Sequence, residues 1–217
     1  MIWDWNFAGK ILPDLLKGLR VTVEATLLAY VLALVLGLVW AVLRRSGGPV
    51  VGQIVRWIVE FVRSTPLLVQ LFFLFYVLPG AGVKFSAFVT GVIGLGLHYS
   101  TYTSEVYRAG IDDVPRGQWE AATALNLPRH RVWFGVVLPQ AIRRVIPTLG
   151  NYVIAMFKDS PLLLAITVPE MLGAAYSVGT HYFRYLEPIT IAGLLFVIVS
   201  VLASILTRRL ERRYGNN

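Results

Sequence analysis

The chain has 217 residues, of which 56% are hydrophobic and 15% are charged, and its formal net charge is +8. The charged fraction lies well below the roughly 25% of soluble domains, so the composition excludes an ordinary soluble domain and predicts an all-α protein embedded in a lipid membrane. The basic residues flank long apolar stretches instead of forming one stripe, which argues against nucleic-acid binding, and the lack of cysteine excludes disulfides and thiolate metal sites.

Residues 1–20 form the first predicted element, an amphipathic segment on the outer surface of the membrane. Ile11 and Leu15 belong to its apolar face, whereas Lys10 and Lys17 belong to its polar face. The two tryptophans among its first five residues suit the headgroup region of a bilayer. The segment is expected to anchor the chain at the interface; a docking surface for a partner is the alternative.

Two membrane spans are expected next. A helix needs about 20 mainly apolar residues to cross the hydrocarbon, and residues 21–43 meet this requirement. The second span is expected near residues 57–78. Ser64, Thr65 and Pro66 mark a helix start or a break within it, because proline suits the first helical turn and disfavours helix at the residue before it.

The third span is expected at residues 85–106, and its second half is a run of polar residues that a lipid-facing helix would not carry. His98, Thr101, Tyr102 and Glu105 share one face of this helix. Polar and ionisable groups at membrane depth are candidates for function, so this face is expected to line the bundle interior or a water-filled path for a solute. His98 as a packing residue and Glu105 as a gate or an ion-pair partner remain open.

A long basic loop, residues 109–140, follows the third span. It contains a predicted short helix at residues 117–125, bounded by Pro115 and Pro128. Because so short a helix is not stable alone in water, it must dock either on the chain's own helix ends or on a partner protein.

The fourth span, residues 145–168, is interrupted at Lys158-Asp159-Ser160-Pro161 and is therefore expected to be broken there. Broken helices in transporters bind ions and charged groups. Lys158 and Asp159 are thus candidates to receive the two charges of a zwitterionic solute, although they could instead neutralise each other.

The last span is expected at residues 189–206. Most of the basic residues lie in the regions 44–63, 108–144 and 208–213, which alternate with regions of few positive charges. Since basic residues favour the cytoplasmic side, five spans are expected, with the N-terminus outside and the C-terminus inside.

The basic loop carries a spaced motif that resembles a known family. Glu120-Ala121-Ala122, Asn126 and Leu138-Pro139 are similar to the EAA loop of ABC importer permeases, in which EAA is followed after three residues by Gly and after nine more by Ile-x-Leu-Pro. Asn126 stands in place of Gly, and Val136 in place of Ile. Asn tolerates the left-handed backbone that Gly adopts, so the first departure is mild. The second is a conservative change between two β-branched residues.

Further runs at residues 16–22, 60–70, 104–111 and 157–162 resemble the polar amino acid branch of that family. The Trp-Asp-Trp opening and the Phe-Lys-Asp-Ser-Pro run are most similar to permeases assigned to ectoine or hydroxyectoine uptake.

The resemblance implies a single permease domain, residues 1–217, with the type I ABC importer fold in the bacterial cytoplasmic (inner) membrane. It implies a second permease subunit, identical or related, an extracytoplasmic solute-binding protein, and two ATPase subunits that bind ATP and Mg. Glu120, Ala121, Ala122, Asn126, Leu138 and Pro139 would couple this chain to the ATPase. The chain lacks a Gly-rich phosphate loop of its own, so it is expected to be a permease subunit without cofactor or metal and not an enzyme.

Two other classes are less consistent with the sequence. An ion-driven secondary transporter subunit would usually show paired internal repeats, and none is evident. An intramembrane hydrolase would need a nucleophile and a base within hydrogen-bond reach, but His98 and Ser100 on one helix point about 200° apart.

Overall fold

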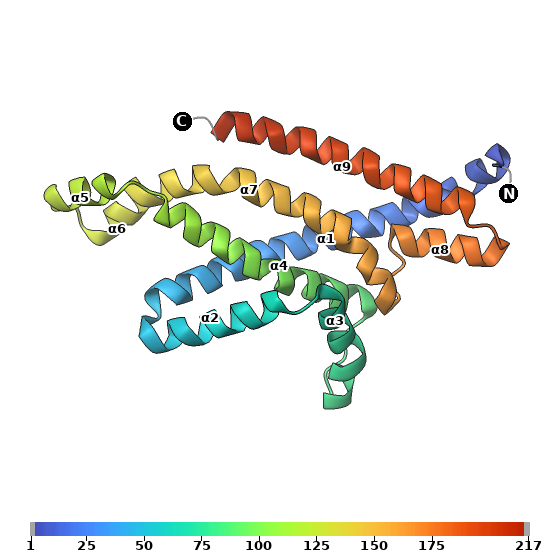
Figure 1. Ribbon diagram of the computed structural model, residues 1–217, viewed down its shortest axis with the longest axis horizontal. Helices are drawn as coiled ribbons and strands as arrows, with labels where there is room; N and C mark the ends of the chain where they lie inside the picture. Colours follow the sequence, from blue (N-terminus) through green and yellow to red (C-terminus); the bar gives the residue numbers. More distant parts are fainter. Residues whose placement is uncertain (1–2, 215–217) are drawn as a thin grey trace.

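Helices make up nearly all of residues 3–214, the part of the chain that the computed structural model describes (Figure 1). In chain order they are α1 (Trp5–Ser46), α2 (Gly48–Ser64), α3 (Leu67–Phe72), the π-helical turn η1 (Phe73–Val77), the 3-10 turn η2 (Leu78–Ala81), α4 (Ala87–Asp112), α5 (Arg116–Ala124), α6 (Arg129–Arg131), the π-helical turn η3 (Val132–Val137), α7 (Leu138–Asp159), the 3-10 turn η4 (Ser160–Ile166), α8 (Met171–Tyr182) and α9 (Leu186–Tyr214).

α1 is one continuous helix of 42 residues, so the expected outer segment and first span are a single element. Its N-terminus is capped by Asp4, whose side chain accepts from the backbone N–H groups of Asn6 and Phe7. Pro13 lies within the helix without ending it, because the loss of one backbone donor is outweighed by the packing of Ile11 and Leu15 against α8 and α9. At about 1.5 Å per residue the helix is about 60 Å long, twice the thickness of the hydrocarbon.

Small side chains bring α1 and α4 close together. The buried residues of α1 include Ala25, Ala29, Ala33 and Gly37 at intervals of four, which places them on one face. A Cβ on Gly37 would overlap the hydroxyl of Thr103. Without a hydrophobic drive between helices in lipid, such close backbone approach is a main source of helix association.

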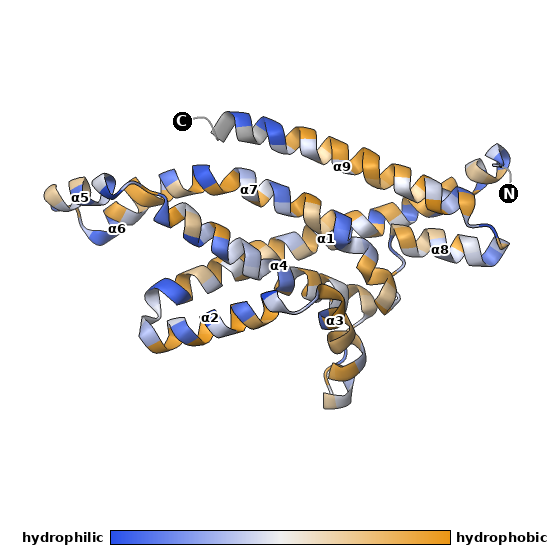
Figure 2. Ribbon diagram, viewed as in Figure 1, coloured by the Kyte–Doolittle hydropathy of each residue, from blue (hydrophilic) through white to orange (hydrophobic). Residues whose placement is uncertain are grey.

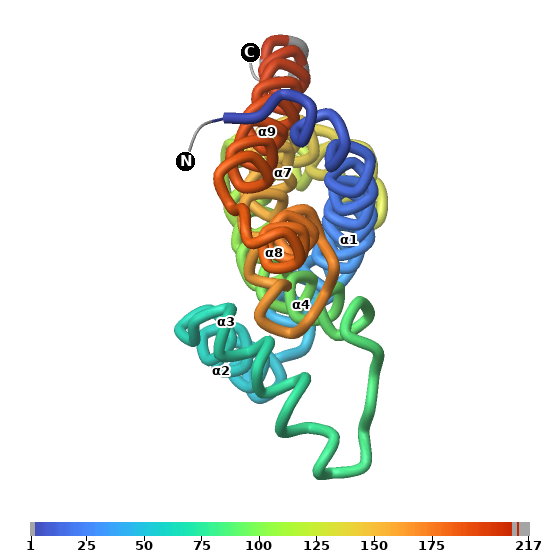
Figure 3. The backbone as a smooth tube through the Cα atoms, turned by 90° about the vertical axis from the view of Figure 1, so that its right-hand side faces the viewer, coloured from blue at the N-terminus to red at the C-terminus, as the bar shows by residue number. Residues whose placement is uncertain are grey.

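The second span is bent, as expected, at Thr65 and Pro66, where α2 and α3 meet at 102°. Both residues have extended backbone, which ends α2. The side-chain amide of Gln70 donates to the carbonyl oxygens of Val62 (2.6 Å) and Thr65 (3.1 Å) and so ties α3 to the end of α2. α3 and the turns that follow it project away from the rest of the bundle (Figure 3).

α4 buries most of its polar run by bonding hydroxyls to its own backbone. Ser100, Thr101 and Ser104 each donate to the carbonyl oxygen three residues earlier, at 2.6–2.7 Å, and Thr103 donates to Ala33 on α1 at 2.8 Å. These side chains are therefore satisfied without water.

The fourth span is broken at the expected place. α7 ends at Asp159, and η4 begins with Ser160 and Pro161. Leu163 and Ile166 of η4 are fully buried against α3 and α4, together with Leu71 and Leu95. The break thus brings η4 into the centre of the largest apolar core.

The long helices run roughly along one axis, whereas α3 turns away from it (Figures 1 and 2). Among the described residues, Trp5–Ser46, Arg129–Ile166 and Leu186–Arg209 are long and apolar enough to cross a membrane, and the bent α2–α3 pair adds a fourth candidate. α4 has 26 residues, about 39 Å, and runs beside α1, although its polar run lowers its hydropathy. Counting α4 gives the five-span arrangement expected from the sequence.

Candidate functional site

A cluster of polar and aromatic side chains lies where α4 crosses α7. The hydroxyl of Tyr99 donates to the carboxylate of Asp159 at 2.6 Å. The rings of Tyr99 and Tyr102 lie 6.0 Å from that of Tyr152, and His98 lies 5.6 Å from Tyr99. We call these five residues and Gln70 the tyrosine cluster.

Gln70 joins the cluster to the bend between α2 and α3. Its side-chain oxygen lies 3.3 Å from Nδ1 of His98, and its amide nitrogen is bonded to the backbone of Val62 and Thr65. The orientation of His98 therefore depends on the geometry of the bend. Gln70 and Tyr152 were not singled out from the sequence, because their place in the cluster depends on how distant helices cross.

The chemistry of the cluster suits a solute with a positive group. Asp159 is only partly buried and keeps acceptor capacity beyond its bond to Tyr99. Tyr102 and Tyr152 are also partly exposed, and their rings can contact a cation. Arg63 follows Val62, whose carbonyl oxygen accepts from Gln70, and so brings a positive group, paired with Glu60 at 2.8 Å, to the bend beside the cluster.

The remaining solute-path candidates lie outside this cluster. Thr101 is buried and bonded to the backbone of His98. Lys158 is exposed, and within residues 3–214 no ion pair joins it to Asp159. Glu105 pairs with Arg44 and Arg108 at the cytoplasmic ends of α1 and α4. Of the six predicted residues, the structure brings together His98, Tyr102 and Asp159.

The predicted coupling helix is α5, at the far end of the molecule (Figure 1). Ala122 is 3% exposed and faces the chain, whereas Glu120 and Ala121 are exposed. Asn126 adopts φ = 50°, the left-handed conformation expected from its position, and the N–H of Leu127 donates to Ala122 at 3.1 Å to close the helix. Leu138 and Pro139 begin α7.

One face of α5 docks on the chain itself through two tryptophans. The rings of Trp119 on α5 and Trp133 on η3 lie 5.5 Å apart in an edge-to-face contact. The guanidinium of Arg45, at the end of α1, lies 5.9 Å and 5.3 Å from these rings and bonds to Asp112 of α4 at 3.0 Å. Arg45 therefore connects the coupling helix to the cytoplasmic ends of α1 and α4, while the opposite face of α5 stays open.

A buried carboxylate at the other end of the molecule was not identified from the sequence. Glu170 is fully buried and caps α8, where it accepts from the N–H groups of Leu172 (2.9 Å) and Gly173 (2.6 Å). It also lies 3.4 Å from the hydroxyl of Thr22 on α1. Burial raises the pKa of Glu170 above its ordinary value, although these hydrogen bonds oppose the shift. The only sequence signal was its place immediately before a helix start.

Comparison with known proteins gives one consistent result. The family model of the binding-protein-dependent transport system inner membrane component matches residues 33–216. A probable amino-acid ABC transporter permease of Sinorhizobium fredii is 49% identical over 218 residues, which cover 95% of this chain and 91% of the relative. An arginine transport system permease of Bacillus subtilis is 31% identical over 99% of this chain and 98% of its own length.

Solved structures agree with these relatives. The crystal structure of an amino acid ABC transporter with histidines contains a chain that superimposes with a TM-score of 0.93 at 32% identity, covering 98% of this chain and all of that chain. A chain of an inward-facing methionine ABC transporter has the same fold, with a TM-score of 0.79 at 19% identity over 94% of this chain and 98% of its own.

Proposed function

Because the chain belongs to the family of inner membrane components of binding-protein-dependent transport systems, we propose that it is the permease subunit of an ATP-driven importer for a small zwitterionic amino acid. As a member of this family it is a multi-pass membrane protein without catalytic activity of its own, and ATP is bound by a separate subunit. The observation that carries the choice of solute is the tyrosine cluster, with its carboxylate, its aromatic rings and the nearby Arg63.

In this proposal the amino group of the solute contacts Asp159 and the faces of Tyr102 and Tyr152. Its carboxylate faces Arg63, and Lys158 supplies positive charge at the solute entrance. His98 positions the cluster through Gln70. Thr101 supports the helix behind it, and Glu105 acts with Arg44 and Arg108 as the inner gate.

The amino-acid class is supported by the relatives, whose names include transport of arginine and of L-cystine. Ectoine and hydroxyectoine remain finer candidates within the same chemistry. They rest on the Trp3-Asp4-Trp5 opening and the Phe157–Pro161 run alone, and none of the similar proteins named above carries such a description.

The partners in this proposal are a second permease subunit, two ATPase subunits and an extracytoplasmic solute-binding protein. The whole chain is one permease domain, with residues 1–20 at the outer surface and residues 109–140 as the coupling loop. Glu120 and Ala121 on the open face of α5 contact the ATPase, where Glu120 pairs with a basic group, and Ala122, Asn126, Leu138 and Pro139 hold α5 in place.

Uptake by the reconstituted complex tests this function. Proteoliposomes with the binding protein outside are given radiolabelled arginine, glutamine, cystine or ectoine, with and without ATP inside. We expect uptake of one of them, dependent on ATP and unaffected when ionophores collapse the ion gradients. Uptake that persists without ATP but stops when the gradient is collapsed would instead identify the alternative, an ion-driven secondary transporter.

A further inference from the structure

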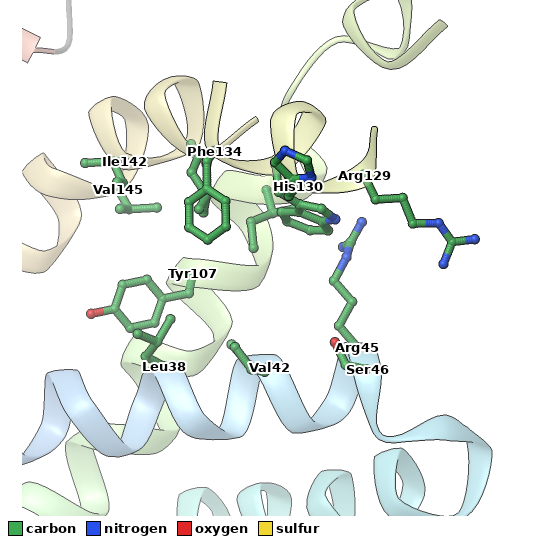
Figure 4. Close-up of a pocket in the computed structure, with 15 residues that line it drawn as sticks. Leu38, Val42, Arg45, Ser46, Tyr107, Arg129, His130, Phe134, Ile142 and Val145 are labelled. Atoms are coloured by element: carbon green, nitrogen blue, oxygen red, sulfur yellow. The ribbon is translucent and has the colours of Figure 1, made fainter. Parts of the chain in front are cut away.

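A large apolar crevice opens between the cytoplasmic halves of α1, α4 and α7 (Figure 4). Its volume is about 880 Å³, and it shares no residue with the tyrosine cluster. Leu38 and Val42 of α1, Tyr107 of α4, and Phe134 and Val145 of η3 and α7 form much of its wall. A cavity of this size and composition is suited to hydrocarbon and not to a polar solute.

The crevice is apolar at the end toward the middle of the bundle and basic at the end toward the cytoplasm. Figure 4 shows Arg45 and Arg129 on one side of the opening, with His130 nearby, whereas Leu38, Tyr107 and Val145 lie at the other side. From Leu38 to Arg45 the helix rises by about 10 Å. None of the lining residues is Asp or Glu.

We call the basic opening formed by Arg45, Arg129 and His130 the rim. These groups differ in whether an acidic side chain already pairs with them. Arg45 bonds to Asp112, which lies just outside the crevice. Arg129 and His130 are exposed and take part in no ion pair within residues 3–214. The rim therefore keeps uncompensated positive charge and hydrogen-bond donors at the cytoplasmic end of the crevice.

We propose that this crevice binds one anionic phospholipid of the cytoplasmic leaflet. The phosphate contacts Arg129 and His130, with Arg45 beside them, and an acyl chain occupies the space between Leu38, Tyr107 and Val145. Basic pockets between membrane helices on the cytoplasmic side are suited to anionic headgroups. The amphipathic shape favours a lipid over a free anion, which would leave the apolar end empty. The proposal does not depend on which solute is transported.

Native mass spectrometry of the delipidated permease–ATPase complex tests the site. The complex is titrated with phosphatidylglycerol or with phosphatidylcholine of the same acyl chains. We expect phosphatidylglycerol to bind more tightly, and the double variant Arg129→Ala/His130→Ala to weaken it by at least about fivefold, the effect of about 1 kcal/mol for the charge of Arg129 near a membrane surface, with the lost His130 donor adding to it. Arg131→Ala is the matched control, because Arg131 is exposed on the same short helix but does not line the crevice. Equal affinity for the two lipids, or equal weakening by the control, would overturn the proposal.

A second measurement identifies the occupant directly. The chain has no cysteine, so Phe134→Cys, at an exposed position on the wall, can be labelled with a benzophenone maleimide in the complex reconstituted with phosphatidylglycerol. Illumination should attach lipid to the permease, and the double rim variant should reduce the yield. A cross-link to a second permease chain or to the ATPase would show that a protein covers the crevice, and the lipid assignment would then be wrong.

Discussion

At the scale of single residues, the bond between Tyr99 and Asp159 is the contact on which the proposed solute site depends. It joins α4 to the last residue of α7, where the fourth span breaks. The carboxylate of Asp159 is thus fixed at a helix end by Tyr99, whose ring lies 5.8 Å from the partly exposed ring of Tyr102.

Asp159→Asn should reduce uptake more than Tyr99→Phe. The first change removes the charge that attracts the solute, whereas the second removes only the donor that orients it. With about 1.5–3 kcal/mol for a hydrogen bond to a charged group, we expect a loss of about tenfold or more for Asp159→Asn. Radiolabelled uptake is the measurement. Thr101→Val is the control, because the Thr101 hydroxyl bonds only to backbone; an equal loss in this control would remove Asp159 from the site.

Glu170 should make stability depend on pH. Because burial raises its pKa, the folded state favours the protonated form. Its contribution is therefore complete below its ordinary pKa of 4.5 and is lost as the pH rises through the raised value. In Glu170→Gln this dependence disappears, so the melting temperature of the wild-type complex should fall relative to that of the variant as the pH rises above 4.5. Parallel melting curves across this range would contradict the assignment.

At the scale of elements, α5 is a short helix held by one face and open on the other. Trp119 and Ala122 attach it to η3 and to the end of α1, and Glu120 remains exposed. A segment of nine residues has little stability of its own, so its position is set by these contacts.

Glu120→Ala should impair coupling without unfolding the protein, because the side chain is exposed and makes no hydrogen bond or ion pair within residues 3–214. We expect solute-stimulated ATP hydrolysis to fall by about tenfold or more, because a charge-assisted contact contributes about 1.5–3 kcal/mol, with an unchanged melting temperature. Glu24→Ala is the control, since Glu24 pairs only with Arg20 on the outer half of α1. Unchanged stimulation in Glu120→Ala would exclude the role in coupling.

The contact between α1 and α4 gives a prediction about stability. Gly37→Ala places a methyl group against Thr103 and the backbone of Ser100, and neither can move without shifting a helix. Overpacking of this kind costs about 1–3 kcal/mol, so we expect a lower melting temperature of the purified complex. Gly9→Ala is the matched control, because its added Cβ would meet no atom within 4 Å. Equal melting temperatures for the two variants would show that the helices are not closely packed at Gly37.

At the scale of the whole molecule, the features that could be predicted from the sequence are those with local causes. The bend at Pro66, the break at Pro161 and the left-handed Asn126 each follow from the backbone limits of one residue. From the sequence, residues 1–20 and 21–43 were expected as separate elements; they form one helix through Pro13 because tertiary packing outweighs the local effect of proline there. The tyrosine cluster could not be predicted from the sequence either, since it depends on where α3, α4 and α7 cross.

The two ends of the molecule differ in the charge of their side chains. Arg44 and Arg45 end α1, and Arg116, Arg129 and Arg131 lie on α5 and α6, whereas Figure 2 shows α9 as hydrophobic over most of its length. The exposed apolar side chains of α9, such as Val197 and Leu202, have no partner within the described chain that covers them. In a membrane protein this surface faces lipid or another subunit.

The continuity of α1 has a mechanical consequence. The outer end of the helix is held by the Asp4 N–H, which donates to Glu187 of α9 at 3.1 Å, and its inner end carries Arg45 against the tryptophans of the coupling segment. A straight rod of about 60 Å that tilts by about 5° moves one end relative to the other by about 5 Å. In the proposed importer, a movement of the ATPase at α5 would thus displace the outer end of the protein through α1 alone, without a relay of intermediate elements.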